Sequence, residues 1–184
     1  MKNSKFTFIL SIIAILYFLF MGTGKAISAE KTIRIGSPFP SGHILTDAAE
    51  KFKELIEKRS GGRIAVQFEF GTKSEEEIIR LNSAGEVEMQ SNGTQFLQIF
   101  APPYYFFTGP YVMKDFDHYM RVWNGKLGQQ AQAEMAKNGN MKYLGTIYRG
   151  VRQTTTKKPL YMPADVSGLK LRLPVIPSWI AVWK

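Results

Sequence analysis

The stretch that specifies the fold covers residues 31–70 and reads KTIRIGSPFPSGHILTDAAEKFKELIEKRSGGRIAVQFEF. Residues 31–36 alternate apolar and polar side chains, which predicts a first strand. After a turn, apolar residues recur at helical spacing, and the Ser-Gly-Gly at residues 60–62 ends that helix. Residues 63–70 alternate again, with an apolar side chain at every second position from Ile64 to Phe70. The stretch therefore predicts a strand–helix–strand unit.

The same order continues directly afterwards. Ser74 and Glu77 have the spacing of a capping box, so we expect a second helix from there to Gly85. Val87 and Met89 then begin a third strand. Alternation of strands with helices is typical of a parallel sheet with right-handed crossovers, so the predicted fold class is α/β.

The remaining chain is expected to combine short helices with further strands. Residues 94–112 are aromatic and rich in proline, which predicts a packed irregular connection. Asp115 is a candidate helix cap and Gly139 a helix stop, and Pro177 is expected to start a last helix. The other expected elements are helices at residues 115–123 and 127–137 and strands at residues 141–148, 152–156 and 169–173.

The first residues have the pattern of a secretory signal peptide. Lys2 and Lys5 precede an apolar core at residues 6–20, and small residues follow up to Ala29. The core is shorter than the ~20 apolar residues of a spanning helix, so we expect cleavage, after Ala29 in preference to Ser28. An uncleaved membrane anchor is the alternative. Cleavage predicts a periplasmic or extracytoplasmic protein without direct membrane insertion.

We expect two lobes after the leader at residues 1–29. Residues 30–150 would form a first α/β lobe, and residues 151–184 the start of a second. The Trp-Ile-Ala-Val-Trp run at residues 179–183 is an unusual end for a natural domain, because it would leave large apolar side chains exposed. We therefore expect a fragment truncated within its second lobe.

Composition excludes several classes of site. The chain has no cysteine, which rules out disulfides, thiolate metal sites and an acylated lipoprotein anchor. Its formal net charge is +9, and loss of Lys2, Lys5 and Lys25 with the leader would lower it to +6. The remaining basic residues are scattered, with no basic-aromatic platform, so nucleic acid is not an expected partner.

No catalytic pattern is present, so we do not expect an enzyme. The chain lacks a nucleophile elbow, a Walker loop, a dinucleotide fingerprint and an HExxH motif. His43 and His118 are far apart in sequence, so neither a metal nor another cofactor is expected. His43 could line a ligand site, and a solvated turn histidine is the equal alternative. The acidic run at residues 75–77 suits the first turn of a helix.

Three arginines are the candidate anion ligands. Arg149 and Arg152 follow the strand expected at residues 141–148, and Arg172 lies inside the apolar strand expected at residues 169–173. A guanidinium at the end of a sheet is placed where α/β proteins hold small anions. For Arg172, a solvated position on the exposed face is an alternative that the residues alone leave open.

From residue 36 to residue 174, the chain resembles the solute-binding subunit of a tripartite ATP-independent periplasmic (TRAP) transporter, of the dicarboxylate-binding type. Five segments carry the resemblance, in the same order and at similar spacing, behind a leader. They are SGH (41–43), KRSGGRI (58–64), GEVEM (85–89), GVRQT (150–154) and PADVSGLKLRLP (163–174).

The resemblance implies a type II periplasmic-binding-protein-like fold, with two lobes that close over a ligand. On that pattern Arg172 would pair bidentately with a substrate carboxylate, and Arg152 would be a second basic contact. Ser91, Asn92 and Thr94 lie where the family's first lobe offers polar contacts.

The chain also departs from the family pattern. The glycine-rich loop after the second strand is reduced to the short run at residues 71–74. Arg149 stands where a small polar residue is common, so either the pocket is more cationic than usual or Arg149 points to solvent.

The function implied is capture of an organic acid and its delivery to the membrane subunits of a TRAP permease, without catalysis. The alternative is an extracytoplasmic sensor that hands the same ligand to a receptor kinase.

Overall fold

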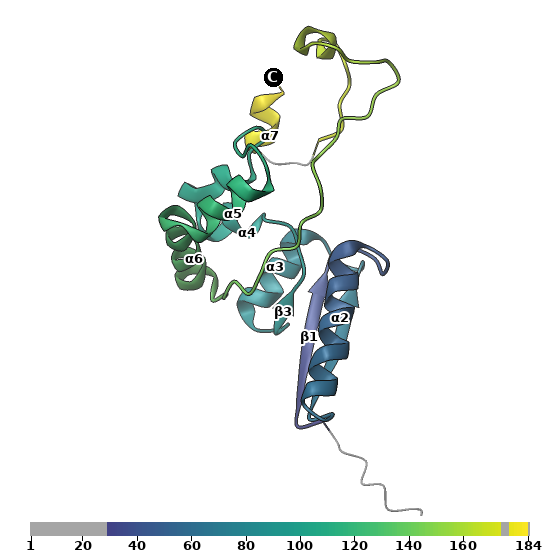
Figure 1. The fold of residues 1–184 in the computed structure, drawn as a ribbon, viewed down its shortest axis with the longest axis vertical. Coiled ribbons are helices and arrows are strands. Elements are labelled where there is room, and N and C mark those ends of the chain that lie inside the picture. The colour runs from purple at the N-terminus through teal and green to yellow at the C-terminus, as the bar shows by residue number, and fades with distance from the viewer. Residues whose placement is uncertain (1–28, 174–176, 184) are drawn as a thin grey trace, which may run out of the picture.

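The computed structural model of the chain describes residues 29–173 and 177–183. The predicted leader therefore lies outside the described residues, apart from Ala29. Figure 1 shows a small sheet with α2 and α3, a helical group formed by α4 to α6, and a long loop that leads to α7. In chain order the elements are β1 (Lys31–Ser37), α2 (Ile44–Arg59), β2 (Ile64–Phe70), α3 (Glu75–Ala84), β3 (Met89–Gln90), α4 (Phe96–Phe100), the 3₁₀ turn η1 (Pro102–Thr108), α5 (Phe116–Asn124), α6 (Lys126–Gly139), the 3₁₀ turn η2 (Pro163–Val166) and α7 (Pro177–Val182).

The sheet has three parallel strands in the order β2-β1-β3. Ile33 lies opposite Val66, and Ile35 lies between Phe68 and Met89. This confirms the expected parallel sheet and its three strands. β1 is the central strand because it contributes backbone hydrogen bonds to both neighbours.

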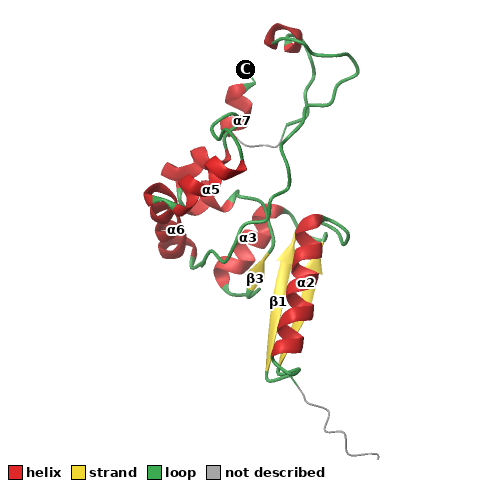
Figure 2. Cartoon of the chain, viewed as in Figure 1, coloured by secondary structure: helices red, strands yellow, loops and turns green. Residues whose placement is uncertain are grey.

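Helices cover both faces of the sheet. Ile35 and Val66 pack with Ala49 of α2 in one buried cluster. Successive side chains of a strand point to opposite faces, so the neighbouring Gly36 faces α3. A Cβ added at Gly36 would lie 2.9 Å from Cδ1 of Ile78. The missing side chain is what lets α3 approach β1 this closely. Figure 2 shows α2 lying along the strands, with α3 beside β3.

Side-chain caps set where the two helices begin. His43 accepts a hydrogen bond from the Leu45 N–H, and the Thr46 hydroxyl accepts one from the His43 N–H, which completes a reciprocal cap of α2. Ser74 accepts from the Glu77 N–H and caps α3, as predicted, but the return bond from the Glu77 side chain is not formed. Gly85 ends α3 in the left-handed conformation, with φ of 78°, where glycine is free of Cβ strain.

A second core is built by the helical group. Leu97, Phe107 and Trp123 are buried together, and Trp123 packs edge-on against Phe107 with ring centroids 5.2 Å apart. Ile79 of α3 is buried with Met135 of α6, which joins this group to the sheet unit. The burial of Phe107 confirms that the aromatic run at residues 104–107 belongs mainly to the core.

The irregular connection expected at residues 94–112 is in fact largely helical, because α4 and η1 form there. Pro102 and Pro103 occupy the first positions of η1. The first N–H groups of a helix have no partner within it, so proline loses nothing at these positions and starts the turn. The helices expected from Asp115, before Gly139 and at Pro177 are confirmed as α5, α6 and α7.

The strands expected at residues 141–148, 152–156 and 169–173 are wrong. No strand forms at any of these described segments, which run as loop. A strand is held by hydrogen bonds to a neighbouring strand. None of the three segments pairs with the sheet, which consists of β2, β1 and β3. Several apolar side chains of the first segment stay exposed, such as Leu144, which is 70% accessible. Among the described helices, none is both long and apolar enough to span a bilayer.

Candidate functional site

The carboxyl ends of the three strands form one edge of the sheet, and polar loops converge there. Ser37, at the end of β1, is fully buried, and its carbonyl accepts from the Gly71 N–H at 2.9 Å. The Ser91 N–H, just after β3, donates to the Gly36 carbonyl at 2.9 Å. In open α/β sheets, ligands bind outside this edge.

His43 lies at this edge as the cap of α2. Its Nδ1 accepts from the Leu45 N–H at 3.2 Å, so its remaining nitrogen, Nε2, is the one available to a ligand. The imidazole stacks on Phe39, with ring centroids 4.2 Å apart and an interplanar angle of 10°. The structure therefore shows His43 as the cap of α2 at this edge. The sequence had suggested either a residue of a ligand site or a solvated turn histidine, and its role at a ligand stays a prediction.

Ser91 and Asn92 connect the edge to both helices. The Ser91 hydroxyl donates to the Leu45 carbonyl at 2.7 Å, and the Asn92 Nδ2 donates to the Glu75 carbonyl at 3.0 Å. The Asn92 Oδ1 accepts from the Gly93 N–H at 2.7 Å. Both side chains thus fix the loop that follows β3. Thr94 lies farther along this loop and is exposed.

Arg149 and Arg152 approach the same edge from the loop after α6. The Arg149 guanidinium carbon lies 4.7 Å from the centroid of the Phe39 ring, which also carries His43. The Arg152 guanidinium carbon lies 4.4 Å from the Trp179 ring. Stacking on an aromatic face holds a guanidinium while its N–H groups stay free to donate in the plane.

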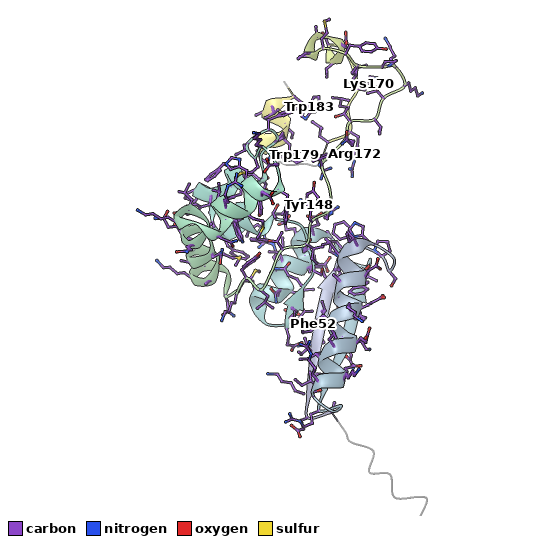
Figure 3. The ribbon with its side chains drawn as sticks, in the orientation of Figure 1. Phe52, Tyr148, Lys170, Arg172, Trp179 and Trp183 are labelled. Atoms are coloured by element: carbon purple, nitrogen blue, oxygen red, sulfur yellow. The ribbon has the colours of Figure 1, made fainter. Side chains whose placement is uncertain are left out.

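Arg172 is not part of this cluster. Leu169, Leu171 and Leu173 are partly buried, whereas Lys170 and Arg172 between them are exposed. In an extended segment this alternation turns Arg172 away from the leucines. Figure 3 shows Arg172 on the long loop, away from the strands.

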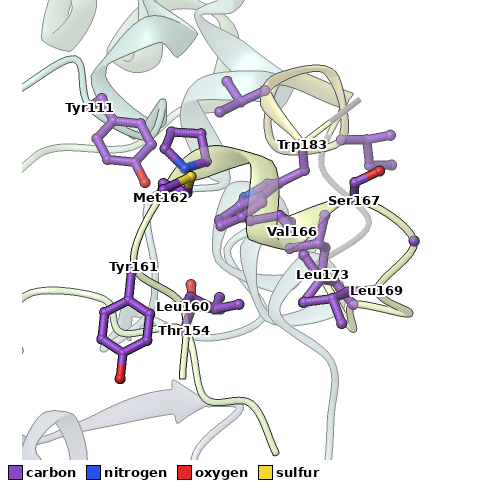
Figure 4. Close-up of a pocket in the computed structure, with 15 residues that line it drawn as sticks. Tyr111, Thr154, Leu160, Tyr161, Met162, Val166, Ser167, Leu169, Leu173 and Trp183 are labelled. Carbon is purple, nitrogen blue, oxygen red and sulfur yellow. The ribbon is translucent and has the colours of Figure 1, made fainter. Parts of the chain in front are cut away.

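The leucines of this segment line a hollow of about 970 Å³ between the long loop and α7. Figure 4 shows its walls, which are mostly apolar and include Leu160, Met162, Val166 and Trp183. Among the described residues that line it, none has a charged side chain. This lining offers a carboxylate hydroxyl groups but no charged partner.

Glu75 is the residue at the edge that sequence reasoning missed. It is the first residue of α3 and is partly buried, and its Oε2 lies 2.7 Å from where a Cβ on Gly93 would stand. Burial raises the pKa of the Glu75 carboxyl, while the charges of Arg149 and Arg152 act to lower it. The sequence signal was its place at the start of the helix that follows β2, where it was grouped with the acidic run at residues 75–77.

Within the described residues, the structure brings together His43, Ser91, Asn92, Arg149 and Glu75, with Arg152 close enough to act on Glu75 by its charge. The described residues contain no group of three or more His, Asp or Glu side chains that could hold a metal ion. The side chains at this edge include hydrogen-bonding groups and charges of both signs.

Comparison with known proteins gives consistent matches. The family described as bacterial extracellular solute-binding protein, family 7, matches residues 35–184. A solute-binding protein of Roseobacter denitrificans is 29% identical over 180 residues, which cover 97% of this chain and 55% of that protein. The sialic acid-binding periplasmic protein of Vibrio cholerae is 27% identical over 158 residues, covering 85% of this chain and 49% of that protein.

Solved structures with a similar fold come from the same kind of protein. A crystal structure of a TRAP periplasmic solute binding protein from Roseobacter denitrificans, with bound L-galactonate, superposes with a TM-score of 0.71 at 28% identity. The match covers 84% of this chain and 52% of that one. The chain spans about half the length of the curated relatives it matches.

Proposed function

Because the chain belongs to the bacterial extracellular solute-binding proteins of family 7, we propose that it captures an organic carboxylate outside the cytoplasm and delivers it to a TRAP-type membrane permease. The expected resemblance to TRAP solute-binding subunits and the periplasmic-binding fold class are confirmed. The protein would bind its ligand without transforming it.

The stacked Arg149 at the carboxyl edge of the sheet is the observation that carries this proposal. A planar guanidinium offers two parallel N–H donors, a geometry that matches a carboxylate. Phe39 supports its face, and Arg152 adds a second positive charge nearby. The names of two relatives point the same way, because sialic acid and L-galactonate are both carboxylates.

We assign the first contacts to His43, Ser91, Asn92, Arg149 and Arg152. The first three are held in place by the loop and helix hydrogen bonds around them. Arg172 and Thr94 lie outside the cluster in this structure, and their roles at the ligand stay predictions.

We retain residues 1–29 as a cleaved leader and a periplasmic location as parts of the proposal. The division into a first lobe at residues 30–150 and the start of a second at residues 151–184 also stays a prediction. The proposal of a single first lobe at residues 30–150 is supported by the buried contact between Ile79 and Met135, which joins the sheet unit to the helical group.

Thermal unfolding with a panel of carboxylates tests the function. A ligand that binds only the folded state raises the melting temperature. We expect L-galactonate or sialic acid to raise the melting temperature of the purified chain, and galactitol, which lacks the carboxylate, to leave it unchanged. Arg149→Ala should remove the shift, whereas Arg80→Ala, on the outer face of α3, should keep it.

Two outcomes would contradict the proposal. If no carboxylate in the panel shifts the melting temperature, the chain is not a carboxylate receptor. If NMR shows that a bound acid is chemically changed by the purified chain, the protein is an enzyme and not a carrier.

A further inference from the structure

Glu75 places a negative charge inside a site that is otherwise built for anions. Its side chain lies against the Gly93 backbone, and its backbone carbonyl accepts from Asn92, so it is fixed at the same edge as the proposed carboxylate contacts. Within the described residues, no ion pair closer than 4.0 Å involves the Glu75 carboxylate. Arg149 and Arg152 act on it through their charges alone.

A capping role does not account for Glu75. Ser74 already caps α3 by accepting from the Glu77 N–H. Glu76 faces outward and pairs with Arg80 at 2.8 Å, and Glu77 is exposed as well. These two carboxylates complement the helix dipole while they remain in solvent, so neither has a large desolvation cost. A third carboxylate that is partly buried costs desolvation free energy that the helix alone does not require.

We propose that Glu75 selects the class of acid that binds, favouring carboxylates that carry hydroxyl or ammonium groups over plain dicarboxylates. This inference rests on the carboxylate-binding function proposed above. The arginines would hold the ligand's carboxylate, and Glu75 would accept a hydrogen bond from a hydroxyl or ammonium group on the same ligand.

The same charge excludes a competing class of ligand. A second ligand carboxylate beside Glu75 would place two like charges together in a partly desolvated site, which is unfavourable. An unsubstituted aliphatic chain would leave the Glu75 oxygens without a donor. Selectivity would therefore come from both an attractive contact and a repulsive one.

Titration calorimetry with two six-carbon probes tests this inference. L-Galactonate has one carboxylate and several hydroxyls, whereas adipate has two carboxylates and no hydroxyl. We expect the wild-type chain to bind L-galactonate at least about tenfold more tightly than adipate, a difference equivalent to one charged hydrogen bond. Glu75→Gln, which is nearly isosteric and neutral, should reduce that ratio about tenfold, by weakening L-galactonate and strengthening adipate.

Glu77→Gln is the matched control, because it removes the same charge from the exposed side of the same helical turn. It should leave the ratio unchanged. Circular dichroism and the melting temperature establish that each variant is folded, and Glu75→Asp provides a second variant that keeps the charge but shortens its reach.

The possible outcomes distinguish a failure of the role proposed for Glu75 from a failure of the proposed carboxylate binding. A wild-type chain that binds both probes equally, or a Glu75→Gln chain with an unchanged ratio, overturns the role of Glu75 and leaves carboxylate binding intact. A wild-type chain that binds neither these probes nor any other carboxylate overturns the proposed function and this inference with it.

Discussion

Residues 31–90 and residues 141–173 are both rich in side chains that favour strands, but only the first region forms a sheet. In the first, β1 has a partner on each side and both faces are covered by helices. In the second, the backbone runs as loop apart from η2, and apolar side chains such as Leu144 and Val151 stay exposed. The difference shows that alternation decides which way side chains point, while a neighbouring strand decides whether a sheet forms.

The contrast between the two regions is tested most directly by removing the same apolar volume from a side chain in each. Ile78 is completely buried against β1, whereas Leu144 is 70% exposed. Ile78→Ala should lower the free energy of unfolding by about 2–5 kcal/mol, through lost burial and a residual cavity. Leu144→Ala should change it by less than about 0.5 kcal/mol. Urea denaturation measures both, and similar losses in the two variants would contradict the contrast.

A hydrogen bond of the sheet edge gives a smaller effect. The Ser91 hydroxyl donates to the Leu45 carbonyl at 2.7 Å and links the end of β3 to the first turn of α2. Ser91→Ala should lower the free energy of unfolding by about 1 kcal/mol. Ser167→Ala, at an exposed serine of the long loop, should fall within about 0.5 kcal/mol of the wild type. If the urea midpoint of Ser91→Ala equals that of the control, the link is not stabilising.

The smallest expected effect is a pH dependence within the sheet unit. Glu88 accepts from the side chain and the backbone N–H of Arg34, and these bonds lower the pKa of its carboxyl from 4.5 to about 2. The folded state therefore gains stability above about pH 4.5, and that gain is lost as the pH falls towards 2. Both side chains are about one-third or more exposed, so the gain is at most about 1 kcal/mol.

The free energy of unfolding of wild type and Glu88→Gln, measured from pH 6.5 to pH 2.5, checks this. The two should differ most near pH 6.5 and converge at the acid end. A difference that stays constant across the range would assign the effect to packing and not to charge.

Local signals predicted the sheet unit well. Ser74 and Gly85 fix where α3 begins and ends through contacts within a few residues, so their roles could be predicted from the chain. The three-strand order follows from alternating strands and helices in the same way. The family and its fold class were also predicted, from five ordered segments.

The candidate site was predicted less completely, because it depends on contacts between distant residues. Arg149 joins the edge through Phe39, which is more than a hundred residues away, and no local pattern specifies that contact. Glu75 was interpreted as a helix-end charge, since its neighbours Glu76 and Glu77 have that role. Arg172 was predicted at the ligand; in this structure it is exposed between partly buried leucines, and its role at the ligand stays a prediction.

The hydrogen bonds of Ser91, Asn92 and His43 also have an entropic consequence. These side chains are already confined to single conformations by their bonds to Leu45, Glu75 and the start of α2. Immobilising a free polar side chain on association costs roughly 0.5–1.5 kcal/mol. For these three side chains, the entropic cost of immobilisation is already incurred when the chain folds, before any ligand binds. Arg149 and Arg152, by contrast, lie in an exposed segment, so a ligand that bound them would have to bear the cost of ordering that segment.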